Sequence, residues 1–154
     1  MLRKLLIAAL VSFAGLAAVG AGLWIRNATP EVPPITAAEL AAPTKPFVVK
    51  LHAQWCPICM LTKHEWAEIE ATYGDRVNLV VFDSTTAADR EASRVEARRL
   101  GLLDVVDNYF GATGMVLVID PRTRKVVREV AGNQEFEVYR AAIDAVLEAT
   151  PPRA

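Results

Sequence analysis

The chain has 154 residues, which is long enough for one domain with a buried core and short for two domains of ordinary size. Its 17 Lys and Arg nearly balance its 18 Asp and Glu, and no run of basic residues forms a stripe along the chain. This charge distribution argues against nucleic acid as a partner.

Residues 1–26 are predicted to form a membrane anchor or signal segment. Arg3 and Lys4 precede 21 uncharged residues, Leu5 to Ile25. As a helix this segment would span about 31 Å, close to the hydrocarbon thickness of about 30 Å. A cleaved signal peptide, with a small-residue site at Ala18–Gly20, is the alternative. Since only Arg26 follows the segment, the positive-inside rule predicts a cytoplasmic N-terminus and an exported remainder.

Residues 27–46 are predicted to be a linker. They contain five prolines and several Ala and Thr, a composition typical of a semi-rigid spacer. The folded domain is then expected over residues 47–150.

Within this domain, short β-branched runs and helical repeats alternate. Strands are predicted at Phe47–Ala53, Arg76–Asp83, Gly114–Asp120 and Lys125–Gly132. Helices are predicted at Cys59–Gly74, Thr86–Gly101 and Glu135–Thr150, the last with Phe136, Tyr139, Ile143 and Leu147 facing inward. The order β-α-β-α-β-β-α predicts an α/β fold with parallel strand pairs covered by helices, followed by one hairpin.

Both cysteines of the chain lie in one short motif, Trp55-Cys56-Pro57-Ile58-Cys59. A structural disulfide here would close so short a loop that it would stabilise little. A zinc site needs about four ligands, and only His52 and His64 are available besides the cysteines. Neither interpretation fits well.

The motif fits a redox centre better, because it lies where a strand gives way to a helix. At a helix N-terminus, unpaired N–H groups and the helix dipole stabilise a thiolate, so Cys56 is expected to attack. Pro57 suits the first helical turn. Cys59 lies one turn deeper on the same face and would resolve the mixed disulfide.

The segment "FVVKLHAQWCPICM" resembles the first strand and active-site motif of the thioredoxin family, a strand followed by Trp-Cys-x-x-Cys. The resemblance extends over Phe47 to Thr150 and implies a thioredoxin-like fold with a central mixed sheet flanked by helices. It also implies that Cys56 is the nucleophile, Cys59 the resolving cysteine and Trp55 a lid beside them.

The N-terminal segment resembles the anchor of membrane-tethered thioredoxin-like proteins of bacterial envelopes. That resemblance implies a single-pass protein of the bacterial inner membrane, with its domain facing the periplasm or secreted side. The expected partners are exported proteins with thiols or disulfides and an electron donor in the membrane. No cofactor is expected.

Thr113-Gly114 departs from the family pattern, because the family usually has a cis-proline facing the disulfide at this place. A non-proline cis bond costs about 2.5–4 kcal/mol, so we expect a trans bond with Gly114 supplying an unusual backbone conformation. The backbone of Thr113 is still expected to pair with a substrate strand. In the family the proline is thought to keep metals off the cysteines, so its loss favours metal or cluster binding.

Lys50 lies where many family members carry a buried Asp that shuttles the proton of the deeper cysteine. A buried ammonium needs a partner or loses its proton. Asp83 is the partner we predict, in a proton relay of reversed polarity. The alternative is that Lys50 extends to solvent.

The two histidines and Trp66 complete the set of candidates. His64 lies at the helix position where the family often has a kinking proline. His52, on the strand before the motif, is better placed to tune a cysteine pKa through its charge. Trp66 is predicted to pack in the core or at an interface.

These observations give three hypotheses. The first is a membrane-tethered thiol-disulfide oxidoreductase acting on exported proteins, with reductase as the favoured direction. The second is a thioredoxin-like module that binds a metal or iron–sulfur cluster through Cys56 and Cys59, with a dimer supplying four thiolates. The third is an inert structural adaptor, which predicts no phenotype for Cys56→Ser.

Overall fold

In a computed structural model of the chain, residues 45–150 are described. The predicted anchor and nearly all of the predicted linker lie outside these residues. Within residues 45–150, no helix is both long and apolar enough to cross a bilayer.

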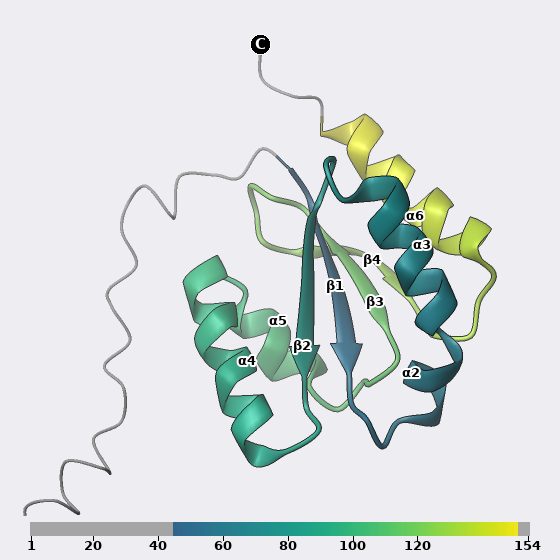
Figure 1. The fold of residues 1–154 in the computed structure, drawn as a ribbon. Helices are drawn as coiled ribbons and strands as arrows, with labels where there is room; N and C mark the ends of the chain where they lie inside the picture. The colour runs from purple at the N-terminus through teal and green to yellow at the C-terminus, as the bar shows by residue number, and fades with distance from the viewer. Residues whose placement is uncertain (1–44, 151–154) are drawn as a thin grey trace, which may run out of the picture. The chain divides into compact units, whose positions relative to one another are not determined.

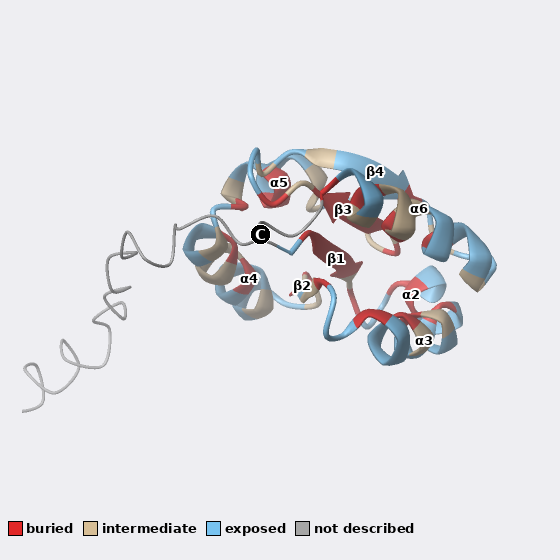
Figure 2. Cartoon of the chain, turned by 90° about the horizontal axis from the view of Figure 1, so that it is seen from above, coloured by how far each residue is buried: buried red, intermediate tan, exposed pale blue. Residues whose placement is uncertain are grey.

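The strands of the described region form one mixed sheet. They are β1 (Phe47–His52), β2 (Asn78–Asp83), β3 (Val116–Ile119) and β4 (Val126–Val130), in the spatial order β2-β1-β3-β4 (Figure 1). β1 and β2 are parallel, with Phe47 opposite Asn78 and His52 opposite Asp83. β3 is antiparallel to both β1 and β4. β1 and β3 are therefore the inner strands, and their residues are almost all buried (Figure 2).

Helices cover both faces of this sheet. They are α2 (Pro57–Leu61), α3 (Lys63–Tyr73), α4 (Ala87–Leu100), α5 (Leu103–Tyr109) and α6 (Phe136–Ala149). α3 and α6 lie on one face, and α4 and α5 lie on the other (Figure 1). The strand period of two divides β1 between the faces: Val48 packs with α3 and α6, and Val49 packs with α4 and α5. The sheet is thus the middle of three layers.

Two of the predicted helices have clear sequence causes. Thr86 and Asp89 form a reciprocal capping box at the start of α4, and Gly101 ends the helix with a left-handed φ of 70°. In α6, Tyr139 and Ile143 are buried, and the predicted inward residues Phe136 and Leu147 pack against the same cluster. Both helices confirm the expectation from their periodicity.

The predicted helix over Cys59–Gly74 is wrong as a single element, because it breaks at Thr62. Thr62 adopts φ −92° and ψ 20°, and both its N–H and its hydroxyl donate to the Ile58 carbonyl, each at 3.0 Å. A threonine that bonds back to the preceding turn bends a helix. The motif therefore lies on the separate short helix α2.

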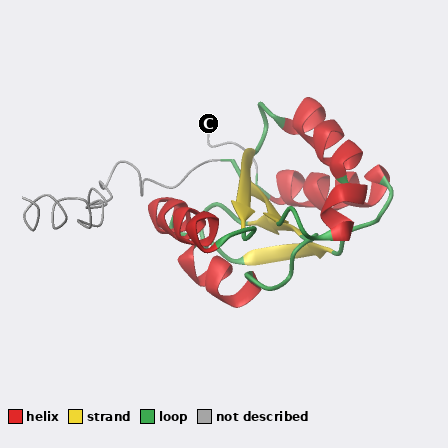
Figure 3. Cartoon of the chain, turned by 60° about the horizontal axis from the view of Figure 1, so that its bottom comes forward, coloured by secondary structure: helices red, strands yellow, loops and turns green. Residues whose placement is uncertain are grey.

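The expected run of parallel pairs is also wrong beyond β1 and β2. The chain contains an additional helix, α5, between α4 and β3. This helix carries the chain back along the sheet, so that β3 starts beside the end of β1 and runs antiparallel to it, with Val116 opposite Lys50. The result places the end of β1, helix α2 and the start of β3 together at the lower end of Figure 1, which comes forward in Figure 3.

Candidate functional site

Cys56 is the N-cap of helix α2. It has an extended backbone (φ −85°, ψ 113°), and its Sγ accepts a hydrogen bond of 3.2 Å from the backbone N–H of Cys59. Pro57 follows at the first helical position, where its missing N–H leaves no bond unmade. The thiol of Cys56 thus faces the unpaired N–H groups of a helix start, as the sequence predicted.

Cys59 lies deeper and is fully buried, whereas Cys56 is 4% exposed. Both are free thiols. The Cys59 thiol donates to the Leu51 carbonyl at 3.7 Å, and the same carbonyl accepts a hydrogen bond of 2.8 Å from the Gly114 N–H. The end of β1 therefore forms hydrogen bonds with both the second cysteine and the segment before β3.

The surroundings of the two thiols shift their pKa values in opposite directions. Burial raises the pKa of Cys56, but hydrogen bonds involving the Cys59 and Thr113 side chains and the N–H groups of Cys59 and Ile58 outweigh it, so the pKa is lowered from 9.0. Burial, then the hydrogen bond and charge of Cys56, raise the pKa of Cys59 above 9.0, and Lys50 opposes this rise. A low-pKa outer thiol beside a high-pKa inner one separates an attacking group from a resolving one.

Gly114 lies against the motif with φ +91°, and there is no cis peptide bond within residues 45–150. The expected trans bond and unusual glycine conformation are therefore confirmed. A Cβ on Gly114 would lie 2.8 Å from Ile58 Cγ2 and 3.6 Å from Cys56 Sγ. A proline here would lose the N–H that bonds to Leu51 and would need a negative φ. Any side chain at this position is therefore strained.

Hydrogen bonds join the loop before the motif to the loop after β2. The Gln54 N–H donates to Thr85 Oγ1 at 2.9 Å, and the Trp55 indole donates to the Thr85 carbonyl at 3.3 Å. Trp55 is nevertheless 61% exposed. Three large apolar side chains of α2 are also exposed: Ile58, Met60 and Leu61.

Lys50 is buried behind α2, at 7% exposure, with its Nζ 5.3 Å from the centre of the Trp66 ring. Most of the side chain is therefore covered, and little of it extends to solvent. The predicted partner Asp83 is wrong: it lies opposite His52, and its Oδ1 accepts from Thr85. Burial lowers the pKa of Lys50, and the charges of Cys59 and Glu70 partly restore it. Trp66 is a core residue, as one of the two predictions for it stated.

The histidines are not gathered with the cysteines into a metal site. His64 is exposed on α3, 4.0 Å from Glu68, and the helix break lies at Thr62 instead. His52 is half-buried, and its Nδ1 has no hydrogen-bond partner in the described part of the chain. Within residues 45–150, no three His, Cys, Asp or Glu side chains lie close enough together to hold a metal ion.

Comparison with known proteins places this geometry in context. Residues 36–108, which include the cysteine motif, match the family model described as Thioredoxin. A thioredoxin-like protein solved in its oxidised form matches with a TM-score of 0.50 and 17% identity, over 79% of this chain and 89% of that one. The fold is thioredoxin-like. The exposed lipoprotein thioredoxin Etrx1 of Streptococcus pneumoniae strain TIGR4 matches with a TM-score of 0.49 and 18% identity, over 70% of this chain and 89% of that one. No curated protein sequence matches significantly.

The thioredoxin-like domain therefore carries a close Cys56–Cys59 pair of the Cys-x-x-Cys kind, consistent with thiol-disulfide exchange. Sequence reasoning found this pair, but it missed residues from distant segments that contact the neighbours of the pair. Gly132, after β4, lies so near that a Cβ there would overlap the Ile58 side chain and the Gly114 carbonyl. Thr85 was missed as well. A glycine beside a strand end was the only signal for Gly132, and nothing in the sequence pointed to Thr85.

Proposed function

We propose that this chain is a thiol-disulfide oxidoreductase that acts as a reductase on exported proteins from a membrane anchor. The observation that carries the proposal is the Cys56 thiol at the N-cap of α2, with its pKa lowered and with the higher-pKa Cys59 one turn behind it. A nucleophile needs a low pKa, and its resolving partner can have a higher one, as Cys56 and Cys59 do.

The reaction follows from these roles. The Cys56 thiolate attacks one sulfur of a substrate disulfide, forms a mixed disulfide and releases the other sulfur as a thiolate, which takes up a proton. Cys59, as a thiolate, then attacks Cys56 Sγ, and the bond to the substrate breaks. The substrate leaves as a dithiol, and the enzyme holds a Cys56–Cys59 disulfide. An electron donor in the membrane returns two electrons, and two protons are taken up, so that this disulfide is reduced again.

Protein substrates suit the surface around Cys56. Trp55 and the α2 residues Ile58, Met60 and Leu61 expose apolar area close in the chain to Cys56, and such area favours contact with a polypeptide. The backbone at Thr113, next to Gly114, is the place where we propose that an extended substrate segment pairs. The proposal also includes the role predicted for His52, which is to tune the pKa of a cysteine through its charge.

The proposed redox direction and cellular location rest on the predicted N-terminal anchor and on the compartment it implies. The predicted anchor at residues 1–26 supports a bacterial inner-membrane protein whose domain faces the periplasm. An oxidising compartment already has oxidants, so a tethered dithiol is most useful there as a reductant supplied from the membrane.

The test is a redox titration of the 154-residue chain, purified anaerobically in detergent, against dithiothreitol. We expect a two-electron couple near about −270 mV, the value of thioredoxin; a value near −120 mV would make the protein an oxidant. A visible absorption band with bound iron, in place of a thiol couple, would replace the proposal by the cluster-binding hypothesis.

Trapping tests the substrate class. We expect Cys59→Ala in envelopes to accumulate mixed disulfides through Cys56, because the resolving thiol is gone. The Cys56→Ala, Cys59→Ala double variant is the control. If both variants capture the same proteins, exported disulfide proteins are not the substrates.

A further inference from the structure

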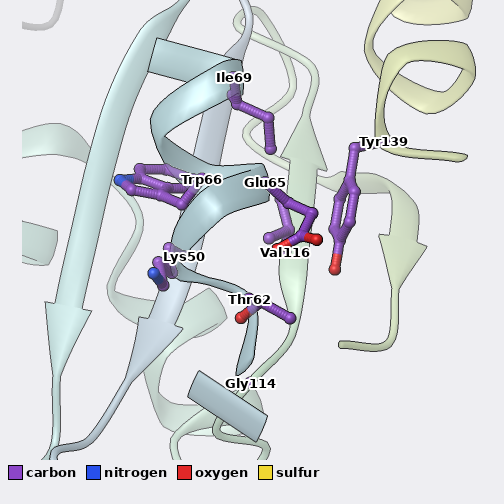
Figure 4. Close-up of a pocket in the computed structure, with 8 residues that line it drawn as sticks. All are labelled: Lys50, Thr62, Glu65, Trp66, Ile69, Gly114, Val116 and Tyr139. Atoms are coloured by element: carbon purple, nitrogen blue, oxygen red, sulfur yellow. The ribbon is translucent and has the colours of Figure 1, made fainter. Parts of the chain in front are cut away.

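Trp55, the residue before Cys56, is an exposed aromatic side chain that a hydrogen bond holds in place. It is 61% exposed, and its indole N–H donates to the Thr85 carbonyl at 3.3 Å. Trp66, by contrast, is buried next to Lys50, and core packing holds it (Figure 4). Because most of Trp55 lies outside the core, the orientation of its ring depends on the segment that carries Thr85.

Residues 83–85 form a fixed segment at the end of β2. The backbone N–H of Asp83 donates to Ser93 Oγ of α4 at 2.8 Å, and this hydroxyl donates back to the Asp83 carbonyl at 2.9 Å. The N–H and the hydroxyl of Ser84 both donate to the His52 carbonyl, at 2.8 and 3.1 Å. The segment is therefore bonded both to α4 and to the end of β1.

Thr85 connects this segment to the loop before the motif. Its N–H and its hydroxyl both donate to Asp83 Oδ1, so an aspartate side chain fixes the backbone two residues further on. Since the hydroxyl proton points to Asp83, a lone pair of the same oxygen is left for the Gln54 N–H, which donates to it at 2.9 Å. The carbonyl of Thr85 accepts the Trp55 indole. Every polar group of Thr85 is thus engaged.

The loop held in this way leads directly into the nucleophile. The Cys56 N–H donates to the Ala53 carbonyl at 3.2 Å, so these two residues close a tight turn. Gln54 and Trp55 are the middle residues of the turn, and both donate to Thr85. Thr85 therefore holds the backbone of the turn through one bond and its exposed ring through the other.

These bonds are separate from those that set the acidity of the nucleophile. The hydrogen bonds that lower the pKa of Cys56 involve α2 and Thr113. A fixed aromatic ring matters instead for recognition, because a side chain that is already ordered loses less freedom when a partner packs on it. Exposed aromatic residues are also frequent anchors of protein interfaces. A small disulfide presents too little surface to use such an anchor.

We propose that Thr85, fixed by Asp83, is a positioning residue that holds the Trp55 ring ready for the polypeptide around a substrate disulfide. Thr85 acts through Trp55 and takes no part in the exchange of sulfur bonds at Cys56. The inference rests on the proposed redox function. It adds to that function a residue that favours protein disulfides over small ones.

The first experiment compares a protein disulfide with a small one. The 154-residue chain is reduced beforehand, freed of reductant and kept in detergent, and its oxidation is followed in a single turnover. Thr85→Val removes the hydroxyl at nearly constant volume. We expect its half-saturation concentration for insulin to rise about three- to tenfold, because the ring must then be ordered on binding. The rate constant with hydroxyethyl disulfide should stay unchanged. An equal loss with both disulfides would overturn the inference.

Two further variants are matched controls. Ser84→Ala removes a hydroxyl from the same segment, but one that bonds to β1, so the half-saturation concentration for insulin should stay at the wild-type value. Thr85→Ser keeps the hydroxyl and should also behave as wild type. If Ser84→Ala weakens insulin binding as much as Thr85→Val, or if Thr85→Ser is as weak as Thr85→Val, the hydroxyl does not position the ring and the inference fails.

A double variant tests whether Thr85 acts through Trp55. Trp55→Ala alone should raise the half-saturation concentration for insulin, and the addition of Thr85→Val should raise it no further. Additive effects would contradict the inference. If Thr85→Val does not fold, Asp83→Ala takes its place, because it removes the acceptor of the Thr85 hydroxyl.

The mobility of the indole gives a readout that does not depend on activity. The NMR order parameter of the Trp55 indole N–H, whose signal Trp55→Phe identifies, should fall in Thr85→Val and stay at the wild-type value in Ser84→Ala. An indole that is equally ordered in all three proteins would overturn the inference.

The same measurements separate this inference from the proposed function. If the reduced wild type reduces neither insulin nor hydroxyethyl disulfide, the proposed function fails. A wild type that reduces both, together with a Thr85→Val variant that matches it on insulin, refutes this inference alone.

Discussion

The backbone N–H of Cys59 donates a hydrogen bond of 3.2 Å to the Sγ of Cys56, so the outer cysteine caps the helix that carries the inner one. One bond therefore links the acidity of the thiol to the start of α2. Chemistry and local stability can be separated by replacing the sulfur with an atom that caps equally well but does not exchange.

Cys56→Ser makes that separation. Ser is among the preferred N-cap residues, so we expect a free energy of unfolding within about 0.5 kcal/mol of wild type, whereas Cys56→Ala loses about 1 kcal/mol. Both variants should reduce insulin disulfides only at the background rate. Urea unfolding and insulin turbidity measure the two effects. Activity retained in Cys56→Ser would show that Cys56 is not the nucleophile. A wild type without reductase activity would instead favour the inert-adaptor hypothesis.

The acidity of Cys56 predicts how its alkylation depends on pH. The thiolate is the reactive form, and hydrogen bonds hold the pKa below 9.0 despite burial, so the iodoacetamide rate should reach half its maximum below pH 9.0. Thr113→Val removes one of these bonds and should move the midpoint upward. Thr123→Val, in the β3–β4 turn, is the control. A midpoint that is the same in all three proteins would exclude Thr113 from setting the acidity.

Gly114 and Gly111 form a matched pair of glycines. Gly114→Ala puts a Cβ 2.8 Å from Ile58 Cγ2 on a backbone with φ +91°, so we expect a loss of about 1–3 kcal/mol in the free energy of unfolding. At Gly111 a Cβ meets nothing within 4 Å, and Gly111→Ala should be neutral or stabilising. Urea unfolding compares them. In an Ile58→Ala background, part of the Gly114→Ala loss should disappear; a fully additive result would remove the steric explanation.

Tyr73, the last residue of α3, joins this helix to α6, because its hydroxyl donates to Asp144 Oδ1 at 3.0 Å. Burial and this bond raise the pKa of Tyr73 from 10.0 to about 12. The neutral phenol therefore contributes stability that is complete below pH 10.0 and is lost as the pH rises through about 12.

Tyr73→Phe should lower the free energy of unfolding by about 1 kcal/mol at pH 7 and flatten its decline above pH 10.0. Tyr109→Phe, whose hydroxyl bonds to Glu129 at the surface, is the control and should change little. Unfolding measured from pH 7 to 11 tests both statements. An unchanged decline in Tyr73→Phe would assign it to other groups.

Features that depend on local pattern could be predicted from the sequence. The strand before the cysteines, the capped helix α4 and the inward face of α6 all follow from residue period and capping. The placing of Cys56 at a helix start follows in the same way, because Pro57 and the strand before it are adjacent in the chain.

Features that depend on tertiary packing could not be predicted in this way. Helix α5 has no side-chain cap and only seven residues, and the burial of Val105 and Val106 accounts for it. The break at Thr62 depends on a hydroxyl bonding back to Ile58, which no spacing reveals. Lys50 was paired with Asp83 by chain position, but the helix that covers β1 places Trp66 over it instead. The errors over α5 and Lys50 concern which segments meet across the sheet, whereas the break at Thr62 is local.

The two tryptophans of the described region, Trp55 and Trp66, lie in opposite surroundings. Trp55 is largely exposed next to the Cys56 thiol, and Trp66 is buried against the ammonium group of Lys50. An indole's emission responds to solvent, to nearby sulfur and to nearby charge, so the protein contains one optical reporter at the reactive sulfur and another at the buried cation. With Trp55→Phe and Trp66→Phe as references, fluorescence follows oxidation at both places in the same sample without an added label.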